Sequence, residues 1–266
     1  MENKTNYDLT ICYSGGLDSV ISYIYAKSKG YNPLCLFIDM DHEYAEKERI
    51  SMKRVKTYFD EHNISFNPDV KILKIAGLIP LLESRLSNQI IPSRNVMLAT
   101  IGSMFSPRVW INSLDGEQLG KEHDKSVRFF DDTTKLLSFT NEFFQPETII
   151  ESPFASWSKA ETIKWALEYG VPVEALALTS SCYHPTKEKC GVCLTCYKRY
   201  TSFLLNGYIE SGYDDFPIRS DYSKELDIHI PEAKKKNDFT RFTPKRIEEY
   251  YKIKNIISTA TCLKII

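Results

Sequence analysis

Residues 13–19, with the sequence YSGGLDS, have the composition of a loop that binds phosphate. Two consecutive glycines let the backbone turn tightly and bring successive amides against an anion, and a helix starting directly afterwards adds its partial positive charge. The hydroxyls of Ser14 and Ser19 can donate hydrogen bonds to the same oxygens. Asp18 repels phosphate, so we expect it to hold a Mg²⁺ that bridges to the phosphates. The predicted phosphate-binding residues are Ser14, Gly15, Gly16, Leu17, Asp18 and Ser19.

The same segment could instead be a plain strand-to-helix turn. The serines on both sides of the glycines and the acid that follows make that interpretation weaker. The sequence contains neither G-x-x-x-x-G-K-[ST] nor G-x-G-x-x-G, which are the patterns of two different phosphate-binding loops.

Four cysteines, Cys182, Cys190, Cys193 and Cys196, follow the spacing C-x7-C-x2-C-x2-C. Two overlapping C-x2-C units form a tight turn whose thiolates converge, which is typical of a structural zinc site with four sulfur ligands. The alternatives are His184 in place of one cysteine and an iron–sulfur cluster on the same ligands. Cys12 and Cys35 lie in apolar segments, where free cysteine behaves as a small core residue, and we expect no catalytic role for them.

Short apolar runs alternate with segments of helical periodicity over the first hundred residues, which is the pattern of a parallel sheet covered by helices. A capping box at Ser158 and Glu161 predicts a helix that begins there and ends near Gly170. Thr243 and Pro244 predict the start of another helix, extending to about residue 257. The remaining predictions are strands at 8–13, 34–38, 70–75 and 109–112, and helices after each of the first two strands and at 96–105 and 196–205.

The 266 residues have the balance of an ordinary globular protein, with 42% hydrophobic and 26% charged residues and a net charge of −1. A nearly neutral chain lacks the positive field that sequence-independent nucleic-acid binding requires. No apolar run approaches the roughly 20 residues of a membrane span, and we expect a cytoplasmic location. We predict a phosphate-binding domain over 1–175, a zinc-bearing segment over 176–219 and a C-terminal appendage over 220–266.

The string SGGLDS resembles the signature of the PP-loop ATP pyrophosphatases. With three further segments it is similar to the 7-cyano-7-deazaguanine synthase (QueC) family, over about residues 8–205. Those segments are IPSRN at 91–95, SPFASWSKAETIKWALEYGVP at 152–172 and SSCYHPTKEKCGVCLTCYKR at 180–199. The resemblance implies a Rossmann-like α/β fold of the adenine nucleotide alpha hydrolase type, with a zinc-bearing helical C-terminal part.

The resemblance also implies an activity. ATP and Mg²⁺ would activate a carboxylated deazapurine, 7-carboxy-7-deazaguanine, by adenylation, ammonia would form the amide, and the amide would be activated and dehydrated to the nitrile. Asp18, Arg94 and Lys159 would be the catalytic residues, and Asn95 would lie near the nucleotide or substrate. A surface charge is the alternative for Arg94, and an ordinary position after a helix cap is the alternative for Lys159. The zinc would be structural and near the substrate, and the enzyme would be a homodimer.

One stretch departs from the family pattern. Residues 116–124 read GEQLGKEHD where the family has a sequence that helps form the base pocket, and Asp124 and Phe129 correspond only loosely to it. The C-terminal residues also lack a counterpart and could recruit a protein partner. These differences leave open a divergent enzyme that joins the acid to another amine. The activity could also be that of an amidoligase like NAD or GMP synthetase or of a transfer-RNA thiolation enzyme, and the chain could be a nucleotide-binding module without activity.

Overall fold

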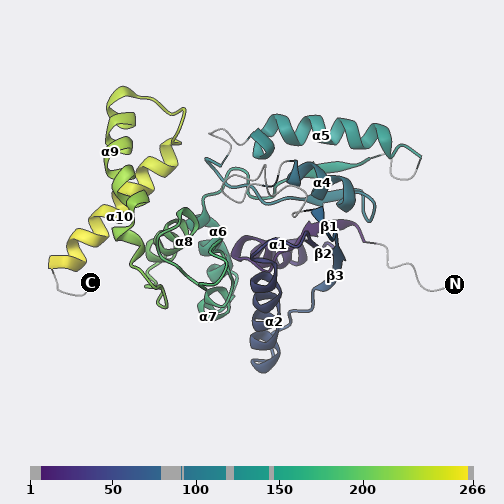
Figure 1. The fold of residues 1–266 in the computed structure, drawn as a ribbon, viewed down its shortest axis with the longest axis horizontal. Helices are drawn as coiled ribbons and strands as arrows, with labels where there is room; N and C mark the ends of the chain where they lie inside the picture. The colour runs from purple at the N-terminus through teal and green to yellow at the C-terminus, as the bar shows by residue number, and fades with distance from the viewer. Residues whose placement is uncertain (1–6, 79–90, 92, 118–122, 144–146, 263–266) are drawn as a thin grey trace.

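A parallel five-stranded sheet organises the molecule (Figure 1). The computed structural model describes residues 7–78, 91, 93–117, 123–143 and 147–262. The strands lie in the order β3-β2-β1-β4-β5. Their bounds are β1 Leu9–Cys12, β2 Pro33–Asp39, β3 Asp69–Lys74, β4 Arg108–Trp110 and β5 Ile149–Glu151. The chain therefore builds one half of the sheet outward from β1, then crosses back to add β4 on the other side of β1.

The pairing of the strands places apolar side chains of neighbouring strands on the same face of the sheet. All seven residues of β2 are buried, as expected for an internal strand covered on both faces. Ile11 of β1 pairs with Cys35 of β2 and with Trp110 of β4, so three apolar side chains at one level project to the same face. β3 lies at one edge of the sheet and exposes Ile72 and Leu73.

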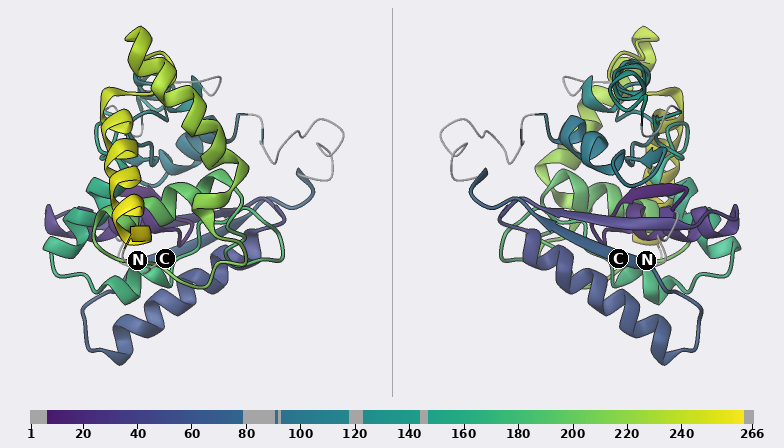
Figure 2. Two further views of the ribbon diagram at one scale, coloured as in Figure 1. Left: turned by 90° about the vertical axis from the view of Figure 1, so that its left-hand side faces the viewer. Right: turned by 90° about the vertical axis from the view of Figure 1, so that its right-hand side faces the viewer.

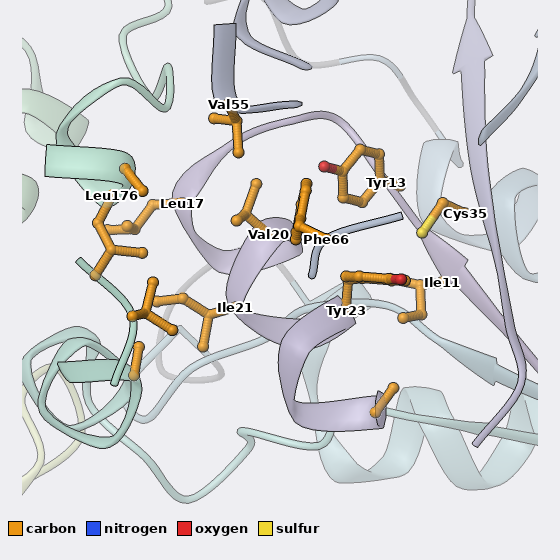
Figure 3. Packing of buried hydrophobic residues seen from close by; sticks show 14 of the residues in the cluster. Ile11, Tyr13, Leu17, Val20, Ile21, Tyr23, Cys35, Val55, Phe66 and Leu176 are labelled. Atoms are coloured by element: carbon orange, nitrogen blue, oxygen red, sulfur yellow. The ribbon is translucent and has the colours of Figure 1, made fainter. Parts of the chain in front are cut away.

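Helices cover both faces of the sheet, as the sequence predicts. On one face, α1 Leu17–Ser28, α2 Ala45–Glu61 and α6 Lys159–Glu168 pack against a core that includes Leu9, Ile11 and Val20 (Figure 3). On the other face, α4 Arg94–Gly102 and α5 Val127–Thr140 pack on Val109, Ile111 and Ile150. Figure 1 shows α4 and α5 on the opposite side of the sheet from α1 and α2.

The C-terminal helices form a separate apolar cluster on the outside of α8 Leu194–Leu205. α9 Asp221–Lys236 and α10 Pro244–Cys262 lie beside each other in yellow-green and yellow (Figure 2) and contact α8. Their buried contacts include Leu226, Ile230, Phe242 and Tyr250, which pack with Tyr197 of α8. The predicted division of the chain into three parts stays a prediction. No helix of the described residues is long and apolar enough to cross a membrane.

Most predicted elements are present with shifted ends. The predicted helix at 96–105 is Arg94–Gly102, the strand at 109–112 is Arg108–Trp110, and the helix at 196–205 begins at Leu194. The capping box is confirmed: the Ser158 hydroxyl accepts from the Glu161 amide, and the Glu161 carboxylate accepts from the Ser158 amide. The sequence analysis missed α5, α9, β5 and the short α7 Val173–Ala177. Pro231 inside α9 argues against a helix there, and tertiary packing outweighs that penalty.

Candidate active site

A cleft of about 250 Å³ opens at the carboxyl ends of the strands, beside the point where the strand order reverses between β1 and β4. Open α/β sheets place their ligand sites at this position, because the connections on either side diverge. The sequence-predicted residues that line it are Ser14, Asp18, Ser19, Arg94, Asn95, Lys159 and Cys182. The fold thus brings residues from four distant parts of the chain to one cavity.

The loop after β1 is a tight turn that is held by its own hydrogen bonds. Gly15 has a φ of +68°, in the left-handed region that favours glycine, and a Cβ added there would lie 2.5 Å from Met52 Cγ. The Gly16 amide donates to Ser14 Oγ at 3.3 Å, and Ser19 Oγ donates to the Gly16 carbonyl at 2.9 Å. The side chain of Leu17 packs in the core, so only its backbone amide, at the start of α1, is suited to an anion.

A distant segment forms the adjoining wall of this loop. Ser180 pairs with Gly16 in an isolated parallel bridge. Its amide donates to Ser51 Oγ at 2.9 Å, and Ser51 Oγ donates to the Gly15 carbonyl at 2.6 Å. These contacts hold the loop between α2 and the segment that leads into the cysteine cluster. No local pattern in the sequence indicates this pairing.

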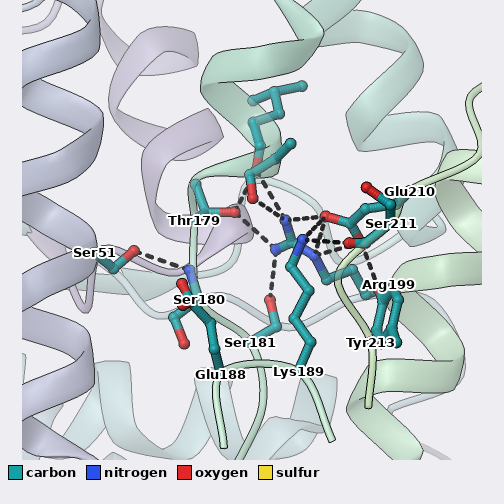
Figure 4. Close-up of polar contacts among 12 residues, drawn as sticks. Ser51, Thr179, Ser180, Ser181, Glu188, Lys189, Arg199, Glu210, Ser211 and Tyr213 are labelled. Atoms are coloured by element: carbon teal, nitrogen blue, oxygen red, sulfur yellow. Dashed lines mark hydrogen bonds and ion pairs between the residues drawn. The ribbon is translucent and has the colours of Figure 1, made fainter. Parts of the chain in front are cut away.

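A buried arginine holds that segment in place (Figure 4). Arg199 of α8 donates to both carboxylate oxygens of Glu210, to Thr179 Oγ1 at 2.8 Å and to Ser181 Oγ at 3.2 Å. It also donates to the carbonyls of Leu176 and Ala177. Because Arg199 and Glu210 are both removed from water, this ion pair fixes the chain that enters the cleft at Ser180.

Asp18 and Lys159 meet inside the cleft. Lys159 Nζ lies 2.6 Å from one oxygen of the Asp18 carboxylate and 2.7 Å from the other. Asp18 is on the first turn of α1, and Lys159 is the first residue of α6 after the capping box. The capping box therefore also fixes the position of a lysine that faces the loop after β1.

Three charged residues that the sequence analysis did not single out also line the cleft. Glu117, which follows β4, contacts Lys125 Nζ at 3.0 Å and Lys198 Nζ at 3.8 Å. Burial opposes ionisation of Glu117, but the charges of three neighbouring lysines outweigh it and lower its pKa to about 2. Burial, together with the charge of Arg246, lowers the pKa of Lys198 to about 8. The position of Glu117 after a sheet strand is a signal that could have identified it.

The end of the cleft near β2 combines apolar and charged groups. Arg94 donates to the Tyr44 hydroxyl at 3.3 Å, and His42 lies 2.9 Å from a carboxylate oxygen of Glu48. Burial raises the pKa of Glu48, and His42 partly offsets this effect. Leu36, Ile38, Met40, Ile91 and Leu98 form the apolar lining around these groups. A flat aromatic base with charged substituents would match this mixture of surfaces.

Some of the remaining predicted residues line the cleft, and others pack in the surrounding structure. Asn95 is buried and its amide donates to the Asp124 carbonyl at 3.1 Å, which ties α4 to the segment after β4. Phe129 packs against Phe130 in the core of the α5 face. Pro92 of the IPSRN segment and residues 118–122 of the divergent stretch lie outside the described residues. Cys12 lines the cleft, and burial raises the pKa of its thiol to about 12, which suits a core residue better than a nucleophile.

The four cysteines form a group that fits a metal ion. Their sulfur atoms lie within 4.8 Å of one another, and Cys190 Sγ and Cys196 Sγ are 3.9 Å apart. Tetrahedral zinc with Zn–S bonds of about 2.3 Å requires sulfurs about 3.8 Å apart. Backbone amides point at the sulfurs: those of His184 and Cys190 donate to Cys182 Sγ, and that of Cys196 donates to Cys193 Sγ. Such donors stabilise thiolates, so the cluster can bind zinc.

Lys47 connects this cluster to the cleft. Its ammonium donates to the carbonyls of Cys182, His184 and Lys187 at 2.7, 2.6 and 2.9 Å. The ring of His184 accepts from the amides of Thr186 and Lys187, so it orders the loop rather than replacing a cysteine in the described group. Cys182 itself lines the cleft, which places the cysteine cluster at the wall of the cavity.

Comparison with known proteins adds a family likeness. The family model described as queuosine biosynthesis protein QueC matches residues 9–207. The 7-cyano-7-deazaguanine synthase of Methanocaldococcus jannaschii is 29% identical over 221 residues, covering 73% of this chain and 93% of that protein. The enzyme of the same name from Campylobacter curvus is 26% identical over 220 residues, covering 76% and 93%. That of Saccharolobus solfataricus is 25% identical over 227 residues, covering 78% of this chain but 47% of that protein. The chain thus spans about half the length of this last relative.

Proposed function

Because the chain belongs to the QueC family of queuosine biosynthesis proteins, we propose that it is an ATP-dependent ligase that converts 7-carboxy-7-deazaguanine and ammonia into 7-cyano-7-deazaguanine. The observation that carries this proposal is the meeting of Asp18 and Lys159 in the cleft beside the glycine turn. The relatives named 7-cyano-7-deazaguanine synthase support the substrate and product. The mixed apolar and charged lining supports a heterocyclic acid as the partner of ATP.

The first step is adenylation. A carboxylate oxygen of the acid attacks the α-phosphorus of ATP, the bond from that phosphorus to the bridging oxygen breaks, and pyrophosphate leaves. The backbone amides of residues 15–17 and the hydroxyls of Ser14 and Ser19 bind the leaving pyrophosphate. Lys159 moves its charge from Asp18 to the phosphates. Asp18 is then free to hold Mg²⁺, which shields phosphate charge when bound. Arg94 supplies a fixed positive charge at the opposite wall.

Ammonia next attacks the acyl carbon, forming a C–N bond while the C–O bond to AMP breaks, and a proton leaves the nitrogen. A second ATP adenylates the amide oxygen. Loss of AMP together with the two N–H protons then leaves the nitrile. The lysines around Glu117 neutralise the charges that develop on the departing groups, and Glu117 keeps these lysines protonated and in place.

The divergent stretch favours a second candidate. Glu117 and Lys125 stand in the cleft where residues 116–124 depart from the family pattern, so the enzyme could adenylate a related carboxylic acid or join the acid to a different amine. Homodimerisation and recruitment of a protein partner by the C-terminal helices are further proposals. The oligomeric state in solution, measured by light scattering during gel filtration, tests the first of these.

Mass spectrometry of the products tests the function directly. The protein is incubated with ATP, Mg²⁺, ammonium and 7-carboxy-7-deazaguanine, and we expect the nitrile together with two AMP per product. Acid-dependent exchange of labelled pyrophosphate into ATP isolates the adenylation step. Exchange with this acid but without nitrile favours the divergent enzyme. Failure to consume ATP with this acid contradicts the principal proposal.

A further inference from the structure

A second cavity of about 80 Å³ adjoins the cleft and is bordered by the C-terminal helices. Three residues, Glu117, Lys159 and Lys198, line both cavities, so the two hollows meet at these side chains. The far wall comes from α9 and α10, which lie beyond the residues matched by the family model. These helices contribute Tyr222, Leu226, Ile230, Arg246, Glu249, Tyr250 and Ile253, and the segment between them contributes Phe242.

Ser158 and Lys159, which are consecutive in the sequence, lie where the two cavities meet. Ser158 sends its hydroxyl into the second cavity, where it donates a hydrogen bond to the Glu249 carboxylate. Lys159 sends its ammonium into the cleft, where it contacts Asp18. The start of α6 therefore connects Glu249 to the phosphate loop through two adjacent side chains. The Ser158–Glu249 and Lys159–Asp18 contacts thus join the second cavity to the cleft in which we propose that the reaction takes place.

The charges of the second cavity are unevenly distributed. At the α10 end lies the Glu249 carboxylate, whose pKa is raised by burial and by the charge of Glu161, an effect that the Ser158 hydrogen bond and the charges of Arg246 and Lys245 partly offset. At the cleft end the positive charges of Lys198, Lys159 and Lys125 outnumber the one negative charge of Glu117. The Glu249 carboxylate attracts a cation, whereas the excess positive charge at the cleft end favours a neutral molecule there.

The size and lining of the cavity suit a small hydrogen-bonding ligand. A molecule the size of water needs about 10–15 Å³ of cavity, so this cavity has room for several such molecules. The aromatic side chains of Tyr222, Phe242 and Tyr250 line the cavity, and aromatic rings can attract a small cation. Thr201 and Ser202 hydroxyls complete the wall on α8.

We propose that the second cavity captures ammonium at Glu249 and delivers it as ammonia to the activated acyl group in the cleft. The inference rests on the proposed function, since it names the site for that reaction's nitrogen donor. Ammonium gives one proton to the Glu249 carboxylate, which releases it to solvent, and passes Lys198 as neutral ammonia. Its lone pair then forms the C–N bond, AMP departs with the electrons of the broken C–O bond, and the remaining excess proton passes to solvent.

Neighbouring glutamates provide a matched test. Glu249→Gln removes the carboxylate that faces the cavity, and we expect the KM for ammonium to rise at least tenfold while the KM for ATP and the acid-dependent pyrophosphate exchange stay unchanged. Glu248→Gln alters the adjacent residue, which is exposed and pairs with Lys252, and we expect wild-type values. A second variant, Ser202→Leu, reduces the cavity from the α8 side and should also raise the KM for ammonium.

The outcomes separate this inference from the proposed function. An ammonium KM equal to that of the wild type in both Glu249→Gln and Ser202→Leu, with both variants folded by circular dichroism, overturns the ammonium site. A rise in the KM for ATP equal to the rise for ammonium also overturns it, because the effect would then lie in the cleft. Absence of acid-dependent exchange in the wild-type enzyme instead overturns the proposed function.

Discussion

Lys159 and Asp18 lie 141 residues apart in the sequence and form an ion pair in the wall of the cleft, with the ammonium within 2.7 Å of both carboxylate oxygens. Both side chains are mostly shielded from solvent. The pair therefore occupies the place where we propose that phosphate binds, and incoming charges must replace its mutual attraction for the two side chains to separate.

Replacing either member should impair adenylation. We expect Asp18→Asn and Lys159→Met each to lower kcat/KM for acid-dependent pyrophosphate exchange by about 100-fold or more, because the first weakens the proposed Mg²⁺ site and the second removes a positive charge proposed to contact the phosphates. Lys164→Met is the control, since Lys164 lies on the same helix but is exposed and pairs with Glu168. Exchange at the wild-type rate in Lys159→Met would show that this lysine does not act on the phosphates.

Gly15 should not tolerate a side chain. Gly15→Ala combines a left-handed backbone with a Cβ placed against Met52, and we expect it to destabilise the protein by more than the roughly 1 kcal/mol of the backbone term. Gly30→Ala has a similar φ of +85° with nothing within 4 Å of the added Cβ, so it should cost the backbone term alone. Urea denaturation and ATP titration check both variants. Equal destabilisation of the two would contradict the steric argument.

The buried pair of Arg199 and Glu210 should be important for stability. Arg199→Met leaves the Glu210 carboxylate buried without its main partner, and we expect a loss of about 3–5 kcal/mol in the free energy of unfolding. Arg54→Met removes an arginine from the exposed pair with Glu188 and should cost about 1 kcal/mol or less. Chemical denaturation measures both. Similar losses would mean that burial does not decide the strength of these pairs.

Zinc content should depend on the four clustered cysteines. We expect Cys190→Ser to lose bound zinc and to lower the melting temperature, because three thiolates and a hydroxyl bind zinc less tightly than four thiolates. Cys35→Ala removes a buried core cysteine outside the cluster and should retain one zinc per chain. Elemental analysis by mass spectrometry gives the zinc content. Retention of full zinc in Cys190→Ser would exclude the cluster as the site.

The pH dependence of stability should reveal Glu117. Its folded pKa of about 2 lies below the unfolded value of 4.5, so the ionised carboxylate stabilises the fold above pH 4.5 by about 3 kcal/mol. This contribution disappears as the pH falls from 4.5 to 2, with about half lost by pH 3. We expect the difference in unfolding free energy between wild type and Glu117→Gln to shrink over that range. A difference that stays constant from pH 6 to pH 3 would contradict this assignment.

The sequence alone predicts the parts of this protein that depend on neighbouring residues. Ser14 to Ser19 form their loop because two glycines and the following helix start are encoded within six positions. The capping box at Ser158 and Glu161 acts over three residues, and the cysteine cluster closes within fifteen. Local backbone preferences and close spacing decide these features, so they can be identified before the fold is known.

The tertiary structure alone decides which of these parts meet. Glu117 and Lys125 come from the segment after β4 and Lys198 from α8, and only the order of strands and the packing of α8 bring their charges together. Ser180 joins Gly16, and Glu249 reaches Ser158, through contacts that no local pattern encodes. The physical reason is that these contacts depend on how buried apolar surfaces from distant segments pack together. That packing depends on the whole chain rather than on any local stretch of sequence.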